Sequence, residues 1–190
     1  MSAYPPLEPE QERALLAAAA GDDRAFDRLY DAYLPRVYAY AGYRLPAEDV
    51  EDVVAETFVK MARGLRRFRW RGPGSFSAWL FRIAHNEIAA HYRRRGRGPQ
   101  AMALDAADGV GGDDTPPDGR AEAAERAALV RRLVAALPPR RQEVILLRFF
   151  GGLSNHEIAA ILDLDERTVA SHLSRALDDL RRRWPVAEGQ

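Results

Sequence analysis

Apolar side chains recur at intervals of three and four residues along most of the chain, and the alternating pattern of a strand is nearly absent. These intervals place residues on one face of a helix. The pattern predicts a short helix over about residues 12–20, which Gly21 ends, and a second helix that Asp22 or Asp23 caps. Pro35 lies inside the second helix, where it removes one backbone hydrogen bond. An all-α chain is expected.

Two further helices are predicted before residue 97. The first begins at Pro46, and its acidic side lies opposite a stripe of Val50, Val53, Val54, Phe58, Met61 and Leu65. The second follows the sequence RWRGPG, with Ser75 as its cap, and buries Phe76, Trp79, Leu80, Ile83, Ala84, Ile88 and Tyr92. On a helical projection the residues that lie away from this stripe are Phe81, Arg82, His85, Asn86 and Arg93. We therefore expect these five side chains at the surface.

A segment without helical periodicity separates this part from the rest of the chain. Residues 96–120 are rich in glycine, aspartate, proline and alanine, which is typical of a flexible linker. Helices resume over about residues 121–137 and 140–150, and the latter ends at Gly151 and Gly152. The predicted architecture is two small helical domains, residues 10–97 and 122–184, joined by a flexible acidic linker, residues 98–121. Domains of this size have thin cores.

The second domain contains the spacing of a helix-turn-helix. In the stretch GGLSNHEIAAILDLDERTVASHLSRAL, Ser154 and Glu157 form a capping box, and a tight turn precedes Asp165, which can cap the next helix. The polar face of that helix consists of Arg167, Thr168, Ser171, Ser174 and Arg175. In a DNA-binding module such a face contacts base edges and phosphates. The alternative is a plain helical hairpin with a solvated face, because two arginines neutralise only a few phosphates.

The net charge of zero results from two neighbouring segments of opposite sign. Residues 63–97 hold ten arginines and one acid, whereas residues 98–125 hold seven acids and one arginine. This asymmetry favours a polyanion-binding surface beside an acidic segment. Aromatic residues are interleaved with the arginines, and exposed rings of this kind stack on unpaired bases. The alternative is an arginine-rich solvated face whose aromatic side chains, Phe76, Trp79 and Tyr92 among them, lie in the core.

Several other classes of function find little support. The chain has no cysteine, which excludes disulfides, thiolate catalysis and cysteine zinc sites and fits a cytoplasmic protein. No apolar run approaches ~18 residues, and the N-terminus lacks a secretory signal, so no membrane insertion is expected. The sequence HEIAA lacks the second histidine of a zinc-protease helix. We expect no enzyme activity, no cofactor and no metal site.

Blocks of sequence in both domains resemble one family. The runs DRAFDRLYDAY, AEDVEDVVAETFVKMARGL and GSFSAWLFRIAHNEIAAHYRRR resemble region 2 of bacterial sigma factors. The runs ALPPRRQEVILLRFFGGLSNHEIAAIL and RTVASHLSRAL resemble region 4. With only a short linker between the two, the chain is similar to the extracytoplasmic-function (ECF) group. The resemblance covers roughly residues 10–97 and 122–183, and its specificity comes from the order and number of the blocks.

The resemblance implies a promoter-specificity subunit that binds core RNA polymerase and promoter DNA. The residues that would dock on the clamp helices of the largest polymerase subunit are Glu51, Asp52, Glu56 and Thr57. The −10 element would be opened by Arg69, Trp70, Arg71, Phe81, Arg82, His85, Asn86 and Arg93, with Asn86 at the position that captures a flipped-out base. The −35 element would be read as duplex by Arg167, Thr168, Ser171, Ser174 and Arg175. An anti-sigma factor is expected as a further partner.

The chain departs from the family pattern at a few positions. Ala55 stands where glutamine is frequent, and Ala170 and His172 stand where basic residues are frequent. Fewer contacts to the −35 element are therefore expected, although a reader tethered to polymerase does not need strong affinity of its own.

Two alternative functions remain at this point. One is a sigma-like decoy that binds an anti-sigma factor and never DNA. The other is a LuxR-type regulator, whose DNA-binding domain the sequence SNHEIA…TVASHL also resembles. The latter needs an upstream sensing domain, and the predicted helices of residues 1–97 count against it.

Overall fold

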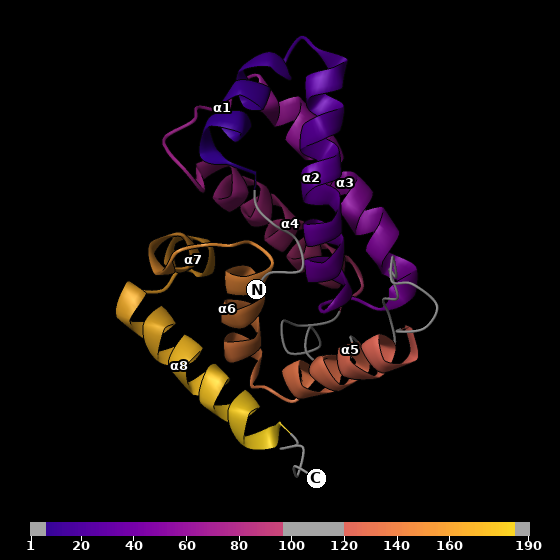
Figure 1. The fold of residues 1–190 in the computed structure, drawn as a ribbon, viewed down its shortest axis with the longest axis vertical. Coiled ribbons are helices and arrows are strands. Elements are labelled where there is room, and N and C mark those ends of the chain that lie inside the picture. Colours follow the sequence, from indigo (N-terminus) through magenta and orange to yellow (C-terminus); the bar gives the residue numbers. More distant parts are fainter. Residues whose placement is uncertain (1–6, 97–119, 185–190) are drawn as a thin grey trace.

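A computed structural model describes residues 7–96 and 120–184, and every regular element in these two ranges is an α-helix (Figure 1). The first range contains α1 (Pro9–Ala18), α2 (Asp23–Gly42), α3 (Ala47–Leu65) and α4 (Ser75–Arg94). The second contains α5 (Arg120–Ala135), α6 (Pro139–Phe149), α7 (Asn155–Leu162) and α8 (Glu166–Arg183). The predicted all-α class is confirmed. The predicted linker, residues 98–121, lies outside the described residues, apart from its last two residues, which already belong to α5.

Local sequence signals account for most helix starts. The Asp22 carboxylate caps α2 by accepting a hydrogen bond from the Arg24 N–H at 3.0 Å, as predicted. Pro46 precedes α3 as its N-cap. The prediction for α4 was wrong by one residue: Gly74 is the N-cap, with φ of 80°, and Ser75 is the first helical residue. This left-handed conformation favours glycine, because it has no Cβ.

The first domain packs α4 against α3 and α2 around a core rich in aromatic side chains. The predicted α3 stripe is buried in full, from Val50 to Leu65. Phe76 lies at the centre, with the rings of Tyr33 and Phe68 at centroid distances of 5.1 and 5.4 Å. Edge-to-face pairs of this kind add to the free energy gained by burial. This core fixes the direction of α4 and the loop before it.

Ion pairs also join α3 to α4. The Lys60 ammonium lies 2.6 Å from the carboxylate of Glu87, which is buried. The Arg95 guanidinium lies 2.6 Å from the buried carboxylate of Asp49. A buried acid needs such a partner, because desolvation of an unpaired charge is costly.

The second domain is organised around α6, in which Val144, Ile145, Leu146 and Leu147 are all buried. Helices α7 and α8 pack against it, and Leu153 fills the space at the turn between α6 and α7. Figure 1 shows α1–α4 in one half of the molecule and α5–α8 in the other, with α7 beside α4. No helix among the described residues is both long and apolar enough to span a membrane.

Candidate nucleic-acid interface

The helix-turn-helix is rigidly capped at both of its helices. The Ser154 hydroxyl accepts a hydrogen bond from the Glu157 N–H at 3.2 Å, and the Glu157 carboxylate accepts one from the Ser154 N–H at 2.7 Å. The predicted capping box is therefore confirmed. In the turn, Asp163 has φ of 54°, a left-handed conformation that aspartate tolerates better than most residues. These features set the direction of α8 relative to α7.

The cap of α8 also occupies one of the predicted DNA contacts. Asp165 accepts hydrogen bonds from the Thr168 N–H at 2.8 Å and from the Thr168 hydroxyl at 2.6 Å. These bonds hold the pKa of the Asp165 carboxyl below its ordinary value. The Thr168 hydroxyl is therefore engaged with its own cap. Arg167, Ser174 and Arg175 are exposed along the helix.

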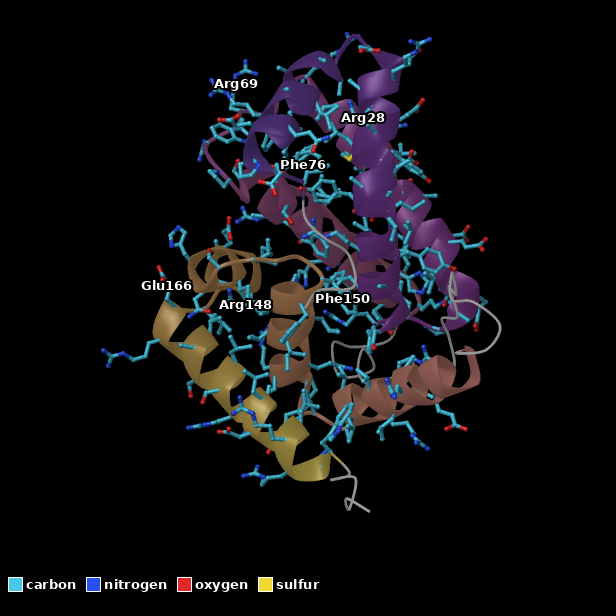
Figure 2. The ribbon with its side chains drawn as sticks, viewed as in Figure 1. Arg28, Arg69, Phe76, Arg148, Phe150 and Glu166 are labelled. Atoms are coloured by element: carbon cyan, nitrogen blue, oxygen red, sulfur yellow. The ribbon has the colours of Figure 1, made fainter. Side chains whose placement is uncertain are left out.

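One acidic side chain and one uncharged histidine limit the positive charge on the first turns of α8. Glu166, labelled in Figure 2 at the start of α8, lies 2.8 Å from the His156 ring. His172 is half-buried, and burial followed by the charges of Arg141 and Arg175 lowers its pKa. A neutral His172 adds no charge at neutral pH. The face of α8 therefore attracts DNA phosphate only weakly.

The exposed face of α4 forms a second stripe that suits nucleic acid. Arg82, Asn86 and Arg93 are exposed, and their spacing of four and seven residues places them on one side of the helix. The asparagine amide can donate and accept hydrogen bonds at a base edge, while guanidinium groups bind phosphate. The prediction that these three residues lie at the surface is confirmed.

The prediction that Phe81 lies at the surface was wrong, because its side chain is fully buried. Its ring packs edge-to-face on Tyr40 of α2 at 5.4 Å, and the Arg36 guanidinium lies 5.8 Å from its centroid. The helical projection assumed one buried side for α4. Helix α4 instead contacts both α2 and α3, so its buried face is wider.

His85 was also expected at the surface, and it is half-buried at the edge of the same region. Its Nδ1 lies 3.4 Å from the Tyr40 hydroxyl. Burial is the main cause that lowers the pKa of His85, and the charge of Arg44 adds to it. The ring is therefore uncharged at neutral pH.

The loop between α3 and α4 presents the remaining predicted contacts to the −10 element. Arg69 and Arg71 are exposed, and Figure 2 labels Arg69 at the outer edge of the molecule. Trp70 is half-buried beneath Arg13 of α1, whose guanidinium lies 5.2 Å from the ring centroid. This cation–π contact was not foreseen, since Arg13 lies 57 positions earlier in the chain.

The acidic face of α3 is accessible over three of its four predicted residues. Glu51, Asp52 and Glu56 are exposed. The prediction that Thr57 belongs to this accessible face was wrong, because its side chain is fully buried. Its hydroxyl donates to the Val53 carbonyl at 2.7 Å. Its spacing of four residues from both Val53 and Met61 would have identified it as buried. Val59 was missed by the sequence analysis and lies 40% exposed on the same side as the acids.

No group of three or more potential metal ligands occurs within residues 7–96 and 120–184. The faces described above hold their side chains through hydrogen bonds, ion pairs and packing. Their chemistry is that of recognition: cations and an amide on α4, hydroxyls and cations on α8, and carboxylates on α3.

Comparison with known proteins matches two parts of the chain to models of one family. Residues 29–98 match the family model for sigma-70 region 2, and residues 127–180 match the model for sigma-70 region 4. The chain is 35% identical over 163 residues to the ECF RNA polymerase sigma-E factor of Escherichia coli, covering 82% of this chain and 84% of that protein. It is 34% identical over 169 residues to the ECF RNA polymerase sigma factor BldN of Streptomyces coelicolor, covering 88% of this chain and 63% of the length of that relative.

Solved structures show the same fold. CnrH in complex with the cytosolic domain of CnrY is similar with a TM-score of 0.63 and 30% identity, over 90% of this chain and 96% of that one. The sigma factor RpoE of Bartonella quintana, in complex with the anti-sigma factor NepR, is similar with a TM-score of 0.64 and 24% identity, over 83% of this chain and 94% of that one.

The region 2 match occupies the part of the chain where a LuxR-type regulator needs a sensing domain, so that alternative is not favoured. The chain belongs to the ECF group of RNA polymerase sigma factors, the subunits that direct transcription initiation at promoters.

Proposed function

We propose that the three exposed faces divide the work of promoter recognition: α3 binds core RNA polymerase, α4 and the loop before it bind the melted −10 element, and α8 reads the −35 element. The observation that carries this proposal is the separation of chemistry among the faces. The carboxylates Glu51 and Asp52 of α3 form no ion pair among the described residues. The stripe of Arg82, Asn86 and Arg93 on α4 combines exposed cations with an amide, and the exposed side of α8 carries Arg167 and Arg175.

The polymerase contact combines charge with an apolar centre. Glu51, Asp52, Glu56 and Val59 lie at helical spacing on one side of α3. An exposed valine flanked by carboxylates fits a basic partner surface that has an apolar patch, because apolar burial adds affinity while charge sets orientation. Thr57 and Phe81 take no direct part in the proposal, since both are buried.

The DNA contacts are of two kinds. Arg69, Arg71, Arg82, Asn86 and Arg93 would follow a melted strand, with Trp70 and His85 at its edge. Arg167, Ser174 and Arg175 would contact duplex DNA, with Thr168 and Ser171 close to the backbone. The weak charge of α8 suits a reader that polymerase holds near its target, because tethering raises the effective concentration.

The proposal extends to the domains and partners of the chain. Residues 10–97 and 122–184 are the two binding units, and residues 98–121 connect them. The solved relatives were captured with CnrY and NepR, so an anti-sigma protein is the expected regulatory partner here as well. The role is recognition and not catalysis, and its place is the cytoplasm, where polymerase acts on DNA.

The test is run-off transcription with purified core polymerase on promoter fragments from the source genome. Transcripts with defined start sites are expected only when the protein is added. A charge reversal, Asp52→Arg, should weaken core binding in a pull-down, whereas Arg28→Ala on α2 should not. Stable core binding without transcripts from any fragment would instead support the decoy that never engages DNA.

A further inference from the structure

Helix α1 lies outside the part of the chain that matches region 2, residues 29–98, yet a buried acid fixes it to that domain. The Tyr33 hydroxyl of α2 donates a hydrogen bond to the Glu12 carboxylate, and both side chains are buried. Burial, followed by the negative charge of Glu12, raises the pKa of Tyr33, so the hydroxyl keeps its proton. Leu15 and Leu16 are also buried. These contacts set the rotation of α1 about its own axis.

The residue after this acid, Arg13, covers an aromatic ring of the loop between α3 and α4. Its side chain is exposed, and its guanidinium lies 5.2 Å from the centroid of the Trp70 ring. Consecutive residues of a helix lie about 100° apart around its axis, so burial of Glu12 leaves Arg13 at the side of α1. A guanidinium that stacks on a ring keeps its N–H groups free to donate in its own plane.

The indole N–H of Trp70 is buried and has no acceptor among the described residues. A buried donor without an acceptor is costly, because it has lost its hydrogen bond to water. An acceptor atom on a bound molecule would remove this cost. The Trp70 ring is only half-buried, so a modest side-chain movement brings the N–H to the surface.

Two further cations flank Trp70 in the chain. Arg69 and Arg71 are exposed, and Figure 2 shows Arg69 at the outer edge of the molecule. The Arg69 guanidinium donates to carbonyl groups of its own loop. Arg13, Arg69 and Arg71 form no ion pair among the described residues. Consecutive Cα atoms lie ~3.8 Å apart, so three guanidinium groups without acidic partners gather near one aromatic ring.

The loop that carries these cations is fixed to the start of α4. The Ser75 hydroxyl accepts a hydrogen bond from the Arg71 N–H at 3.2 Å and donates one to the Gly72 carbonyl at 2.7 Å. Asn86 lies 11 residues further along α4, which is about 16 Å at a rise of 1.5 Å per residue. Nucleotides in one strand of a duplex are only ~3.4 Å apart along the axis. The loop therefore meets a different nucleotide from the one at Asn86.

From this arrangement we infer that Arg13 is a further DNA-binding residue. It binds a phosphate of the melted −10 strand beside Arg69 and Arg71, and it holds Trp70 so that the indole N–H donates to the same nucleotide. The inference rests on the proposed function of α4 and the loop before it, and it adds α1 to the surface that binds DNA. Phosphate contacts fix the register of a strand, so Arg13 sets which nucleotide reaches Asn86.

Substitutions separate the charge of Arg13 from its packing on Trp70. Arg13→Met keeps an apolar stem of similar length and removes the charge. Arg13→Lys keeps the charge and removes the planar group that stacks on the ring. Arg28→Ala, at an exposed arginine on α2, is the matched control. Asn86→Ala tests the proposed function of α4 independently of Arg13. Circular dichroism checks that each variant is folded.

The first readout is the affinity of the full-length protein for a fluorescent single-stranded DNA of about ten nucleotides with randomised sequence. Fluorescence anisotropy is measured at several salt concentrations. Arg13→Met should weaken binding about fivefold and reduce the slope of log affinity against log salt by about 0.7, the value for one phosphate on a single strand. Arg13→Lys should keep the slope, because the charge remains, and Arg28→Ala should change neither value.

The second readout is the NMR signal of the Trp70 indole N–H. The chain has three tryptophans, and the signal that Trp70→Phe removes belongs to Trp70. The same DNA should shift this signal in the unmodified protein and in Arg28→Ala. The shift should be smaller at equal DNA concentration in Arg13→Met.

Weaker binding by Arg13→Met with an unchanged salt slope would overturn the phosphate contact, because loss of packing alone removes no charge. A Trp70 signal that DNA leaves in place would overturn the indole contact. Full affinity in Arg13→Met together with weakened binding in Asn86→Ala would overturn the inference and leave the proposed function of α4 intact. No binding by the unmodified protein would also overturn it, since Arg13, Arg69 and Arg71 are all exposed in the free chain. Run-off transcription then decides separately whether the proposed function holds.

Discussion

The two regions differ in how far each supplies its own stability. Region 2 encloses aromatic side chains and pairs its buried acids within itself, as with Glu87 and Lys60. Region 4 has a smaller aliphatic core around α6, and the carbonyl groups that follow α6 are bound by Arg36 of region 2. The caps therefore set the direction of α8, the helix proposed to read DNA, while the domain that carries α8 depends on contacts with region 2.

The regions also differ in how they hold their recognition side chains. On α4, Asn86 and Arg93 lie on a helix that is packed on two sides, so their positions follow from the core. On α8, the first turn is directed by Asp165 and its bonds to Thr168. The face proposed to bind the −10 element is thus sensitive to packing, and the face proposed to read the −35 element is sensitive to local capping.

The largest expected effect tests the difference between the two cores. Leu147 of α6 and Leu29 of α2 are both fully buried, and Leu→Ala at such sites costs about 3 kcal/mol. A region of roughly 65 residues has a free energy of unfolding of about 3–10 kcal/mol. Leu147→Ala should therefore unfold region 4 first and leave region 2 folded.

Urea titration followed by amide NMR signals from each region would measure this. Leu147→Ala should give two transitions, with region 4 at the lower urea concentration. Leu29→Ala should shift the transition of region 2. A single shared transition for Leu147→Ala would show that the two regions unfold as one cooperative unit.

The next effect concerns the melted strand. Asn86→Ala should lower the rate of open-complex formation about thirtyfold, which corresponds to ~2 kcal/mol for a lost bidentate contact to a base. Permanganate footprinting of the −10 element measures the melted fraction. Affinity for core polymerase should stay unchanged, because the proposed polymerase contacts lie on α3. Equal losses of both would remove Asn86 from the DNA face.

Periodicity and caps were sufficient to predict most of the fold. The α3 stripe, the Ser154–Glu157 box and the caps at Asp22 and Asp165 are local signals, so they can be identified in a single sequence. The family resemblance was likewise carried by contiguous blocks.

The remaining features depend on contacts between distant segments. Phe81 is buried because α2 lies across a second side of α4, and Trp70 is covered by Arg13. The bonds of Arg36 to the end of α6 join residues 114 and 115 positions apart. Helical spacing describes one helix at a time, so it contains no information on such pairs.

A smaller effect distinguishes the −35 face from the rest of α8. Arg175→Ala should weaken binding to duplex −35 DNA about fivefold and reduce the slope of log affinity against log salt by about 1, because one phosphate contact is lost. Arg181→Ala on the same helix should change neither value, since Arg181 pairs with Asp178 near the C-terminus of α8. Fluorescence anisotropy at several salt concentrations measures both. An equal effect at Arg181 would indicate non-specific charge attraction.

The smallest expected effect is a dependence on pH of the contact between region 2 and region 4, in which Arg36 donates to the Phe150 and Gly151 carbonyls. The Nδ1 of His85 on α4 lies 3.4 Å from the Tyr40 hydroxyl. Burial lowers the pKa of His85, and the charges of Arg44 and of Glu143 and Arg140 on α6 also act on it. Separation of the regions exposes the ring and returns its pKa towards the ordinary value near 6.5. The separated regions then bind the proton more readily, so the contact between the regions is fully stable above that value and loses stability as the pH falls through it.

Spin labels on Asp31→Cys of α2 and Arg181→Cys of α8, both exposed in a sequence without cysteine, report the distance between the two regions. This distance should lengthen modestly as the pH is lowered from about 8 to about 5.5. His85→Gln cannot titrate and should remove this response. His172→Gln should retain it, although the pKa of His172 is also lowered, because that ring lies within region 4, next to Arg141 and Arg175. A response that survives in His85→Gln and disappears in His172→Gln would place the pH sensitivity inside region 4 and not at the boundary between the two regions.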